Sequence, residues 1–190
     1  MKIDGEIALF GGSFNPPHMG HVYVIAQVLA RTPAARVMMV PTHTHAFGKE
    51  LLDFEARLRL CEGVAEIFPG RVLVSDVEGV LAAAGRENRT VDTLEHLRAV
   101  HPQARLSLVI GSDLISELPS WKGAERIDAL AERVVINREG YPTEGMGPSI
   151  PDVSSTWVRE RMAEGASVSA WVPRRVIELC EAEGWYLPPR

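Results

Sequence analysis

Runs of apolar residues recur along the chain with the lengths expected of buried strands. Five of them, at residues 6–10, 36–40, 71–77, 105–110 and 133–137, are largely uninterrupted by polar positions. Strands without alternation of polar and apolar residues are typical of parallel sheets, in which helices cover both faces. The pattern therefore predicts five strands of a mostly parallel sheet.

The segments between these runs carry apolar residues at helical spacing. Such residues form one face of each of the segments 22–29, 54–65 and 94–100, as in helices that pack on a sheet. Strands that alternate with helices favour an open α/β fold with right-handed crossovers. We therefore expect a doubly wound parallel sheet.

The chain changes character after its last predicted strand. A segment rich in glycine and proline at 138–152 is interpreted as a loop, and two helices without an intervening strand are predicted beyond it. We expect a single domain over 1–190, with an α/β core at 1–137 and a small C-terminal helical cap at 153–190.

Composition removes several classes of function. The net charge is −5, whereas binders of duplex nucleic acid normally present a basic surface. Cys61 and Cys180 are isolated, so neither a disulfide framework nor a cysteine zinc site is expected. No apolar stretch approaches the ~20 residues of a membrane span, and the first residues do not resemble a signal peptide. These features predict a cytoplasmic protein with no nucleic-acid or membrane partner.

The segment GGSFNPPHMGH, residues 11–21, directly follows the first predicted strand. Ligands of doubly wound sheets bind beyond the carboxyl ends of the strands, at the point where the strand order reverses. Gly11 and Gly12 allow the backbone to approach a ligand closely. The N–H groups of Ser13 and Phe14 come next and are candidates to face a phosphate. Position and composition thus nominate a phosphate-binding loop.

Two histidines end this segment. His18 and His21 are three residues apart, so both can reach one side of the first helical turn. Gly20 lets that helix begin close to an anion. Two alternatives stay open for the loop taken alone: a turn with incidental histidines, or a zinc site shared with His43 and His45.

A second motif, SSTWVRERM, lies at residues 154–162. Serine and threonine are common helix N-caps, so one interpretation is simply a cap. The hydroxyls of Ser155 and Thr156 precede Arg159, however, and place a guanidinium beside the N–H groups of the first turn. Together these groups predict a polyphosphate site.

With both motifs in view, the chain resembles the bacterial nicotinate-mononucleotide adenylyltransferases of the nucleotidyltransferase superfamily. Residues 18–21 match the HxGH motif, and residues 11–21 resemble the family opening GG[TS]FDPxHxGH. Residues 153–159 resemble the ISSTxxR signature. Asn15 stands where the family usually has aspartate, and Val153 stands where it has isoleucine.

Two further segments distinguish members of the superfamily. Residues 88–97 resemble the YTxDTL stretch, with Arg89 in place of the tyrosine and Thr90 retained. The resemblance implies that this stretch receives the nicotinate carboxylate. Residues 110–123 resemble the IGxDxLxxLxxW segment, which implies that Trp121 stacks on the pyridine ring.

The resemblance implies a Rossmann-like fold and transfer of AMP from ATP to nicotinate mononucleotide, with release of pyrophosphate, in NAD biosynthesis. Mg²⁺ is expected to arrive with ATP, and no metal site of the protein's own is expected. The implied catalytic residues are His18, His21, Lys49 and Arg159. The implied ATP-binding residues are Gly11, Gly12, Ser13, Phe14, His18, Gly20, His21, Gly111, Asp113, Ser155, Thr156 and Arg159. The expected mononucleotide-binding residues are Ser13, Phe14, His45, Lys49, Arg57, Thr90 and Trp121. Of these, His45 and Lys49 stand where family members often read PPHK, and with Arg57 they are interpreted as a basic loop that reaches a phosphate, while a solvated lysine is an equal alternative for Lys49.

Three other functions remain compatible with these residues. The acceptor can be nicotinamide mononucleotide or phosphopantetheine, and a protein of this fold can bind nucleotides without catalysis. The intact HxGH and SSTxxR motifs favour an enzyme over such a nucleotide sensor. The sequence leaves open whether the protein forms a homo-oligomer.

Overall fold

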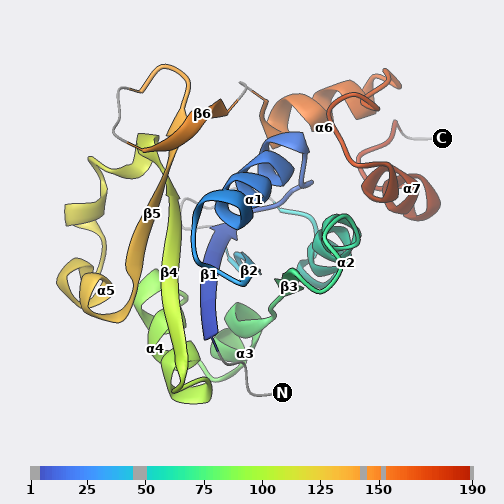
Figure 1. The fold of residues 1–190 in the computed structure, drawn as a ribbon. Helices are drawn as coiled ribbons and strands as arrows, with labels where there is room; N and C mark the ends of the chain where they lie inside the picture. The colour runs from blue at the N-terminus through green and yellow to red at the C-terminus, as the bar shows by residue number, and fades with distance from the viewer. Residues whose placement is uncertain (1–4, 45–50, 142–144, 151–152, 189–190) are drawn as a thin grey trace.

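A six-stranded parallel sheet forms the centre of the molecule (Figure 1). The computed structural model describes residues 5–44, 51–141, 145–150 and 153–188. The strands are β1 (Gly5–Gly12), β2 (Arg36–Pro41), β3 (Val72–Val74), β4 (Ala104–Gly111), β5 (Glu132–Arg138) and β6 (Met146–Ile150). Each neighbouring pair is parallel, in the order β3-β2-β1-β4-β5-β6. The strand order reverses between β1 and β4, and the predicted α/β fold class is confirmed.

Helices connect the strands and continue beyond the sheet. They are α1 (Met19–Arg31), α2 (Phe54–Ala65), α3 (Val77–Ala83), α4 (Thr90–Val100), α5 (Ala124–Leu130), α6 (Ser155–Ala163) and α7 (Arg174–Glu183). Two short 3₁₀ turns, η1 (Ser112–Leu114) and η2 (Leu118–Ser120), follow β4. The predicted helical segments at 22–29, 54–65 and 94–100 thus lie within α1, α2 and α4.

The sequence interpretation was wrong at two segments. The run 71–77 forms only the short edge strand β3, because its last residue, Val77, begins α3 and is buried against the opposite face of the sheet. The supposed loop 138–152 contains β6. Gly147 and Pro148 gave this strand the composition of a loop, but proline is tolerated at a sheet edge, where one side of the strand has no ladder to complete.

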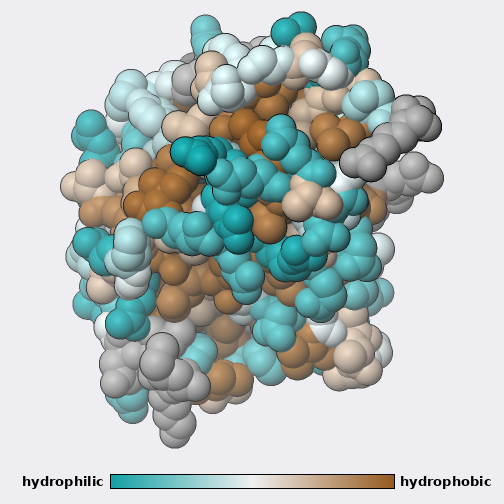
Figure 2. Space-filling model, turned by 90° about the vertical axis from the view of Figure 1, so that its right-hand side faces the viewer, coloured by the Kyte–Doolittle hydropathy of each residue, from teal (hydrophilic) through white to brown (hydrophobic). Residues whose placement is uncertain are grey.

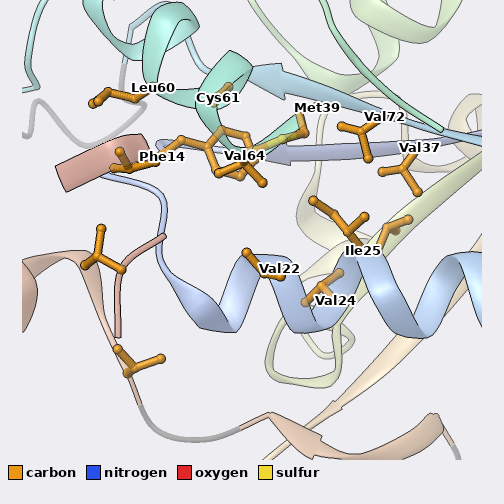
Figure 3. Close-up of a cluster of buried hydrophobic side chains, with 14 of the residues drawn as sticks. Phe14, Val22, Val24, Ile25, Val37, Met39, Leu60, Cys61, Val64 and Val72 are labelled. Carbon is orange, nitrogen blue, oxygen red and sulfur yellow. The ribbon is translucent and has the colours of Figure 1, made fainter. Parts of the chain in front are cut away.

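Alternate residues of the strands feed two hydrophobic clusters, one on each face of the sheet. Ala8 belongs to the cluster beneath α1, α2, α6 and α7, whereas Ile7 and Leu9 belong to the cluster beneath α3, α4 and α5. Figure 3 shows the first of these, with side chains of α1 and α2 directed toward those of β2. The C-terminal helices α6 and α7 therefore share a core with the α/β part of the chain.

The face shown in Figure 2 is a mixture of hydrophilic residues and small groups of hydrophobic residues. Large side chains that remain exposed include Trp157 and Trp171, whose rings meet edge to face with centroids 5.6 Å apart. Among the helices of the described residues, none is both long and apolar enough to cross a membrane.

The core of the first cluster makes a direct stability prediction. Ile25 is 0% exposed, and its replacement by alanine leaves a cavity between α1 and the sheet. We expect Ile25→Ala to lower the free energy of unfolding by about 2–5 kcal/mol in urea denaturation. The matched control is Ile67→Ala, because Ile67 is 46% exposed and should cost less than about 1 kcal/mol. Equal losses in the two variants would contradict this account of the core.

Candidate active site

Two cavities adjoin at the carboxyl ends of β1 and β4. Their volumes are about 430 Å³ and about 340 Å³. They share the backbone that leaves β1, at Gly11, Gly12 and Ser13, together with Val109 and Ile110 at the end of β4. The switch point of the sheet thus opens into two compartments with a common wall, which suits two ligands that react with each other.

The first cavity is bordered by the N-terminal ends of α1 and α6. Every residue that the sequence analysis assigned to ATP lines it, from Gly11 and Gly12 of β1 to Arg159 of α6. Helix N-termini favour anions, because their first N–H groups have no partner within the helix. Motifs from distant parts of the chain are therefore brought together in one anion-binding compartment.

The loop between β1 and α1 is held by side chains from other elements. Arg57 Nη1 donates to the Ser13 carbonyl at 3.0 Å, and Arg159 Nη1 donates to the Asn15 carbonyl at 2.8 Å. Ser155 Oγ donates to the Pro16 carbonyl at 2.9 Å. Three successive attachments from α2 and α6 thus fix the path of the loop.

Close packing within this loop explains its glycine. Phe14 has a φ of 46°, in the left-handed region, and its ring packs edge to face against Phe10 and His21. A Cβ at Gly12 would lie 3.1 Å from Phe14 Cζ, tighter than ordinary contact allows. The second glycine of the motif is therefore needed to accommodate the phenylalanine two residues later.

The two motif histidines stack beside each other, with ring centroids 3.9 Å apart. The backbone N–H of His18 donates to His21 Nδ1 at 3.0 Å. When the His21 ring is neutral, its proton must therefore lie on Nε2, which becomes the available donor. His18 Nδ1 is buried and has no hydrogen-bond partner among the described residues.

Both imidazoles are neutral at pH 7. Burial, with a smaller effect of the positive charge of Arg138, lowers the pKa of His18 from 6.5 to about 4. Burial, followed by the charges of His18 and Arg138, also holds the pKa of His21 well below its usual range. Burial thus favours the neutral form of both rings, in which each ring carries one N–H donor.

The first cavity also contains a cation that the sequence analysis missed. Arg138, at the end of β5, lines the cavity, and its Nη1 lies 3.0 Å from Asp113 Oδ2. The signal for it was present, since an arginine directly after a buried parallel strand is placed at the ligand edge of the sheet. Arg138 and Arg159 both line this compartment, and the carboxylate of Asp113 partly neutralises the charge of Arg138.

The second cavity brings together Thr90 and Trp121, as the mononucleotide assignment expected, together with Ser13. Phe14 lines the first cavity instead. His45 and Lys49 lie outside the described residues. Thr90 begins α4, so the first-turn N–H groups of that helix adjoin the second cavity, whose wall also includes the ring of Trp121.

Arg57 is not placed in either cavity. Its side chain is 1% exposed, and besides Ser13 it donates to the carbonyls of Leu52 and His43, at 2.8 and 3.4 Å. All three contacts are with the protein's own backbone. The structure therefore supports a role for Arg57 in holding the loop, and the expected contact with a mononucleotide stays a prediction.

Two polar residues of the second cavity were missed from the sequence. Thr93 is 5% exposed, and its hydroxyl has no hydrogen-bond partner among the described residues. Glu78 accepts a hydrogen bond from the backbone N–H of His43 at 2.8 Å. Burial raises the pKa of Glu78 to about 7, although the His43 N–H and the charge of Arg57 oppose the shift. The spacing of Thr93 from Thr90 could have indicated a common helix face.

The alternative of a zinc site gains no geometric support from the described part of the chain. There, no group of three or more histidine, cysteine or acidic side chains is arranged to hold a metal ion. The described histidine of that proposal, His43, contacts the ring of Phe54 and the hydroxyl of Thr44.

Comparisons with known proteins agree with the site. The cytidylyltransferase-like family model matches residues 9–161. A protein of Anaeromyxobacter dehalogenans, described as a probable nicotinate-nucleotide adenylyltransferase, is 41% identical over 181 residues, covering 95% of this chain and 96% of the relative. A Thermus thermophilus protein with the same description is 36% identical and covers 95% of this chain and 99% of the relative.

Solved structures show the same fold. The nicotinic acid mononucleotide adenylyltransferase of Plasmodium falciparum, complexed with NaAD, superposes with a TM-score of 0.79 at 18% identity, covering 96% of this chain and 97% of the other. A Vibrio parahaemolyticus protein described as a nicotinate-nucleotide adenylyltransferase has a TM-score of 0.73 at 26% identity, covering 98% and 96%. The chain belongs to the cytidylyltransferase-like family, among relatives described as nicotinate-nucleotide adenylyltransferases.

Proposed function

We propose that this protein transfers AMP from Mg-ATP to nicotinate mononucleotide, forming deamido-NAD and pyrophosphate. The observation that carries the proposal is the pair of cavities that share the backbone of Gly11 to Ser13. One compartment has the donors and cations for a polyphosphate, and the other has an aromatic ring and threonine hydroxyls. The names of the relatives agree with this pair of ligands.

The chemistry requires no strong base from the protein. An oxygen of the mononucleotide phosphate attacks the α-phosphorus of ATP, and the bond from that phosphorus to the bridging oxygen of pyrophosphate breaks. A phosphate monoester has a second pKa near ~6, so the nucleophile is already largely ionised at pH 7. The protein has to hold the two phosphates in line and stabilise the charge on the leaving group.

The residues of the first cavity divide these tasks. His21 Nε2–H and the ring of His18 would donate to the ATP phosphates as neutral groups, which suits a reaction in which the donors need not change charge. Ser155, Thr156 and Arg159 would hold the β- and γ-phosphates at the N-terminus of α6. Mg²⁺ would enter on the nucleotide, since this cation prefers phosphate oxygens and water to an all-protein cage.

The second cavity would hold the mononucleotide. Trp121 offers a flat ring on which the pyridine can stack, and the N-terminus of α4 at Thr90 favours a carboxylate. These two features support nicotinate over a phosphopantetheine acceptor, which has no aromatic ring. His45 and Lys49 belong to this proposal as groups for the mononucleotide phosphate, and Lys49 also as a catalytic cation.

The proposed reaction is tested by comparing acceptors directly. With Mg-ATP and nicotinate mononucleotide, nicotinamide mononucleotide or phosphopantetheine, we expect the highest kcat/KM for the nicotinate compound, measured as pyrophosphate release. His21→Ala should lower turnover on the order of 10²–10³, as for the loss of one charge-stabilising donor. That variant also controls for contaminating enzymes. Inactivity with all three acceptors, together with intact ATP binding, would instead indicate a nucleotide sensor.

The unpaired hydroxyl of Thr93 predicts a contact with the mononucleotide. Thr93→Val keeps the shape of the side chain but removes its hydrogen-bonding oxygen, so we expect KM for the mononucleotide to rise about 5–10-fold. KM for ATP should stay within about twofold of the wild-type value, because Thr93 lines the second cavity and not the first. Thr93→Ser is the matched control, since it retains the hydroxyl. A KM near the wild-type value in Thr93→Val, with a raised KM in Thr93→Ser, would show that the methyl group, not the hydroxyl, matters.

The buried His18 predicts a loss of stability in acid. Its pKa of about 4 in the folded chain lies below its ordinary value of 6.5, so between these values the unfolded chain binds a proton that the folded chain excludes. The contribution of neutral, buried His18 to the free energy of unfolding is complete above pH 6.5. It is lost as the pH falls from 6.5 toward 4, by up to about 1.4 kcal/mol per pH unit. Urea unfolding of wild type and His18→Asn at pH 8, 6 and 5 should show a difference that changes with pH in this direction. A difference independent of pH would contradict the assignment.

A further inference from the structure

The side chain of Asn15 joins three segments of the chain that are distant in sequence. It is 2% exposed. Its Oδ1 accepts a hydrogen bond from the backbone N–H of Leu52 at 3.0 Å and another from the hydroxyl of Tyr186 at 2.7 Å. The loop between β1 and α1 is thereby bonded both to the residues that precede α2 and to the segment that follows α7.

Tyr186 is held in place independently of this bond. It lies just beyond Gly184, the C-cap of α7, in the left-handed region with a φ of 61°, and its side chain packs against the hydrophobic cluster under α1 and α2. Burial raises the pKa of the Tyr186 hydroxyl, which keeps it protonated. A fixed, protonated hydroxyl is a permanent donor to Asn15.

The backbone of the same residue holds a cation of the first cavity. The Asn15 carbonyl accepts from Arg159 Nη1 at 2.8 Å, and Arg159 Nη2 lies 3.3 Å from Thr156 Oγ1. The position of the Arg159 guanidinium therefore depends on where Asn15 lies, and Asn15 is located by its two side-chain hydrogen bonds. A path of direct contacts runs from Tyr186 through Asn15 to Arg159.

We infer that Tyr186 and Asn15 are positioning residues for ATP, holding the loop and the Arg159 guanidinium in the geometry that binds the polyphosphate. This inference deepens the proposed function and rests on the assignment of the first cavity to ATP. We call the Tyr186–Asn15 hydrogen bond the C-terminal latch. An asparagine or an aspartate at position 15 provides the same acceptor oxygen, so either residue can form the latch.

The latch is tested by removing one hydroxyl. In Tyr186→Phe we expect the dissociation constant of a non-hydrolysable Mg-ATP analogue, measured by titration calorimetry, to rise about 5-fold, the effect of one buried hydrogen bond. kcat/KM for ATP should fall similarly, and KM for nicotinate mononucleotide should stay within about twofold. Tyr23→Phe, in α1, is the matched control, since Tyr23 lines neither of the two adjoining cavities.

Position 15 provides the second arm. Asn15→Ala should weaken binding of the analogue at least as much as Tyr186→Phe, and adding Tyr186→Phe to it should have no further effect, because the acceptor is already gone. Asn15→Asp keeps the acceptor oxygen, so it should retain most of the affinity for the analogue that Asn15→Ala loses. All measurements are made well below the melting temperature of each variant, so that unfolding does not contribute.

Several outcomes would overturn the latch. They are unchanged affinity for the analogue in Tyr186→Phe, additive effects in the double variant, or a lowered melting temperature as the only change. Failure of the proposed function can be told apart from failure of the latch. In that case wild type binds the analogue but releases no pyrophosphate with any mononucleotide, and the latch is judged on analogue binding alone.

Discussion

The geometry of the site depends on the hydrogen bonds that fix the backbone of the loop between β1 and α1. A phosphate loop acts through its backbone, and a flexible backbone would lose conformational entropy each time a ligand bound. Here the carbonyls of Ser13, Asn15 and Pro16 are each bonded to a side chain from another element. Two of those side chains come from α6, so this C-terminal helix helps to shape the first cavity as well as cover the sheet.

Arg57, a buried cation beside this loop, has its hydrogen bonds satisfied by backbone carbonyls instead of by an opposite charge. Arg57 donates to three backbone carbonyls, and within the described part of the chain none of these three hydrogen bonds ends on a carboxylate. A guanidinium bonded in this way keeps its full positive charge, whereas an ion pair would largely cancel it. The charge of Arg57 thus remains part of the field around a loop that is proposed to receive anions.

The parts of the site that could be predicted from sequence are those written in contiguous motifs. Residues 11–21 and 154–159 carry enough chemistry in a short stretch to be recognised. Arg138 and Thr93 lie outside those motifs. Their sequence signals, an arginine directly after a predicted strand and a threonine three residues after Thr90, are too common to identify a site before the fold places both residues on a cavity. The burial of Arg57 was not foreseeable, because a helical arginine suggests an exposed cation and the burial depends on carbonyls from distant segments, while its expected contact with a mononucleotide stays a prediction.

The wall shared by the two cavities has a consequence for inhibition. Because Gly11, Gly12 and Ser13 border both compartments, a single molecule can extend from one into the other. Two linked halves bind with a high effective concentration for each other, so a dinucleotide gains affinity that neither half has alone. A product of this kind would therefore compete with both substrates at once.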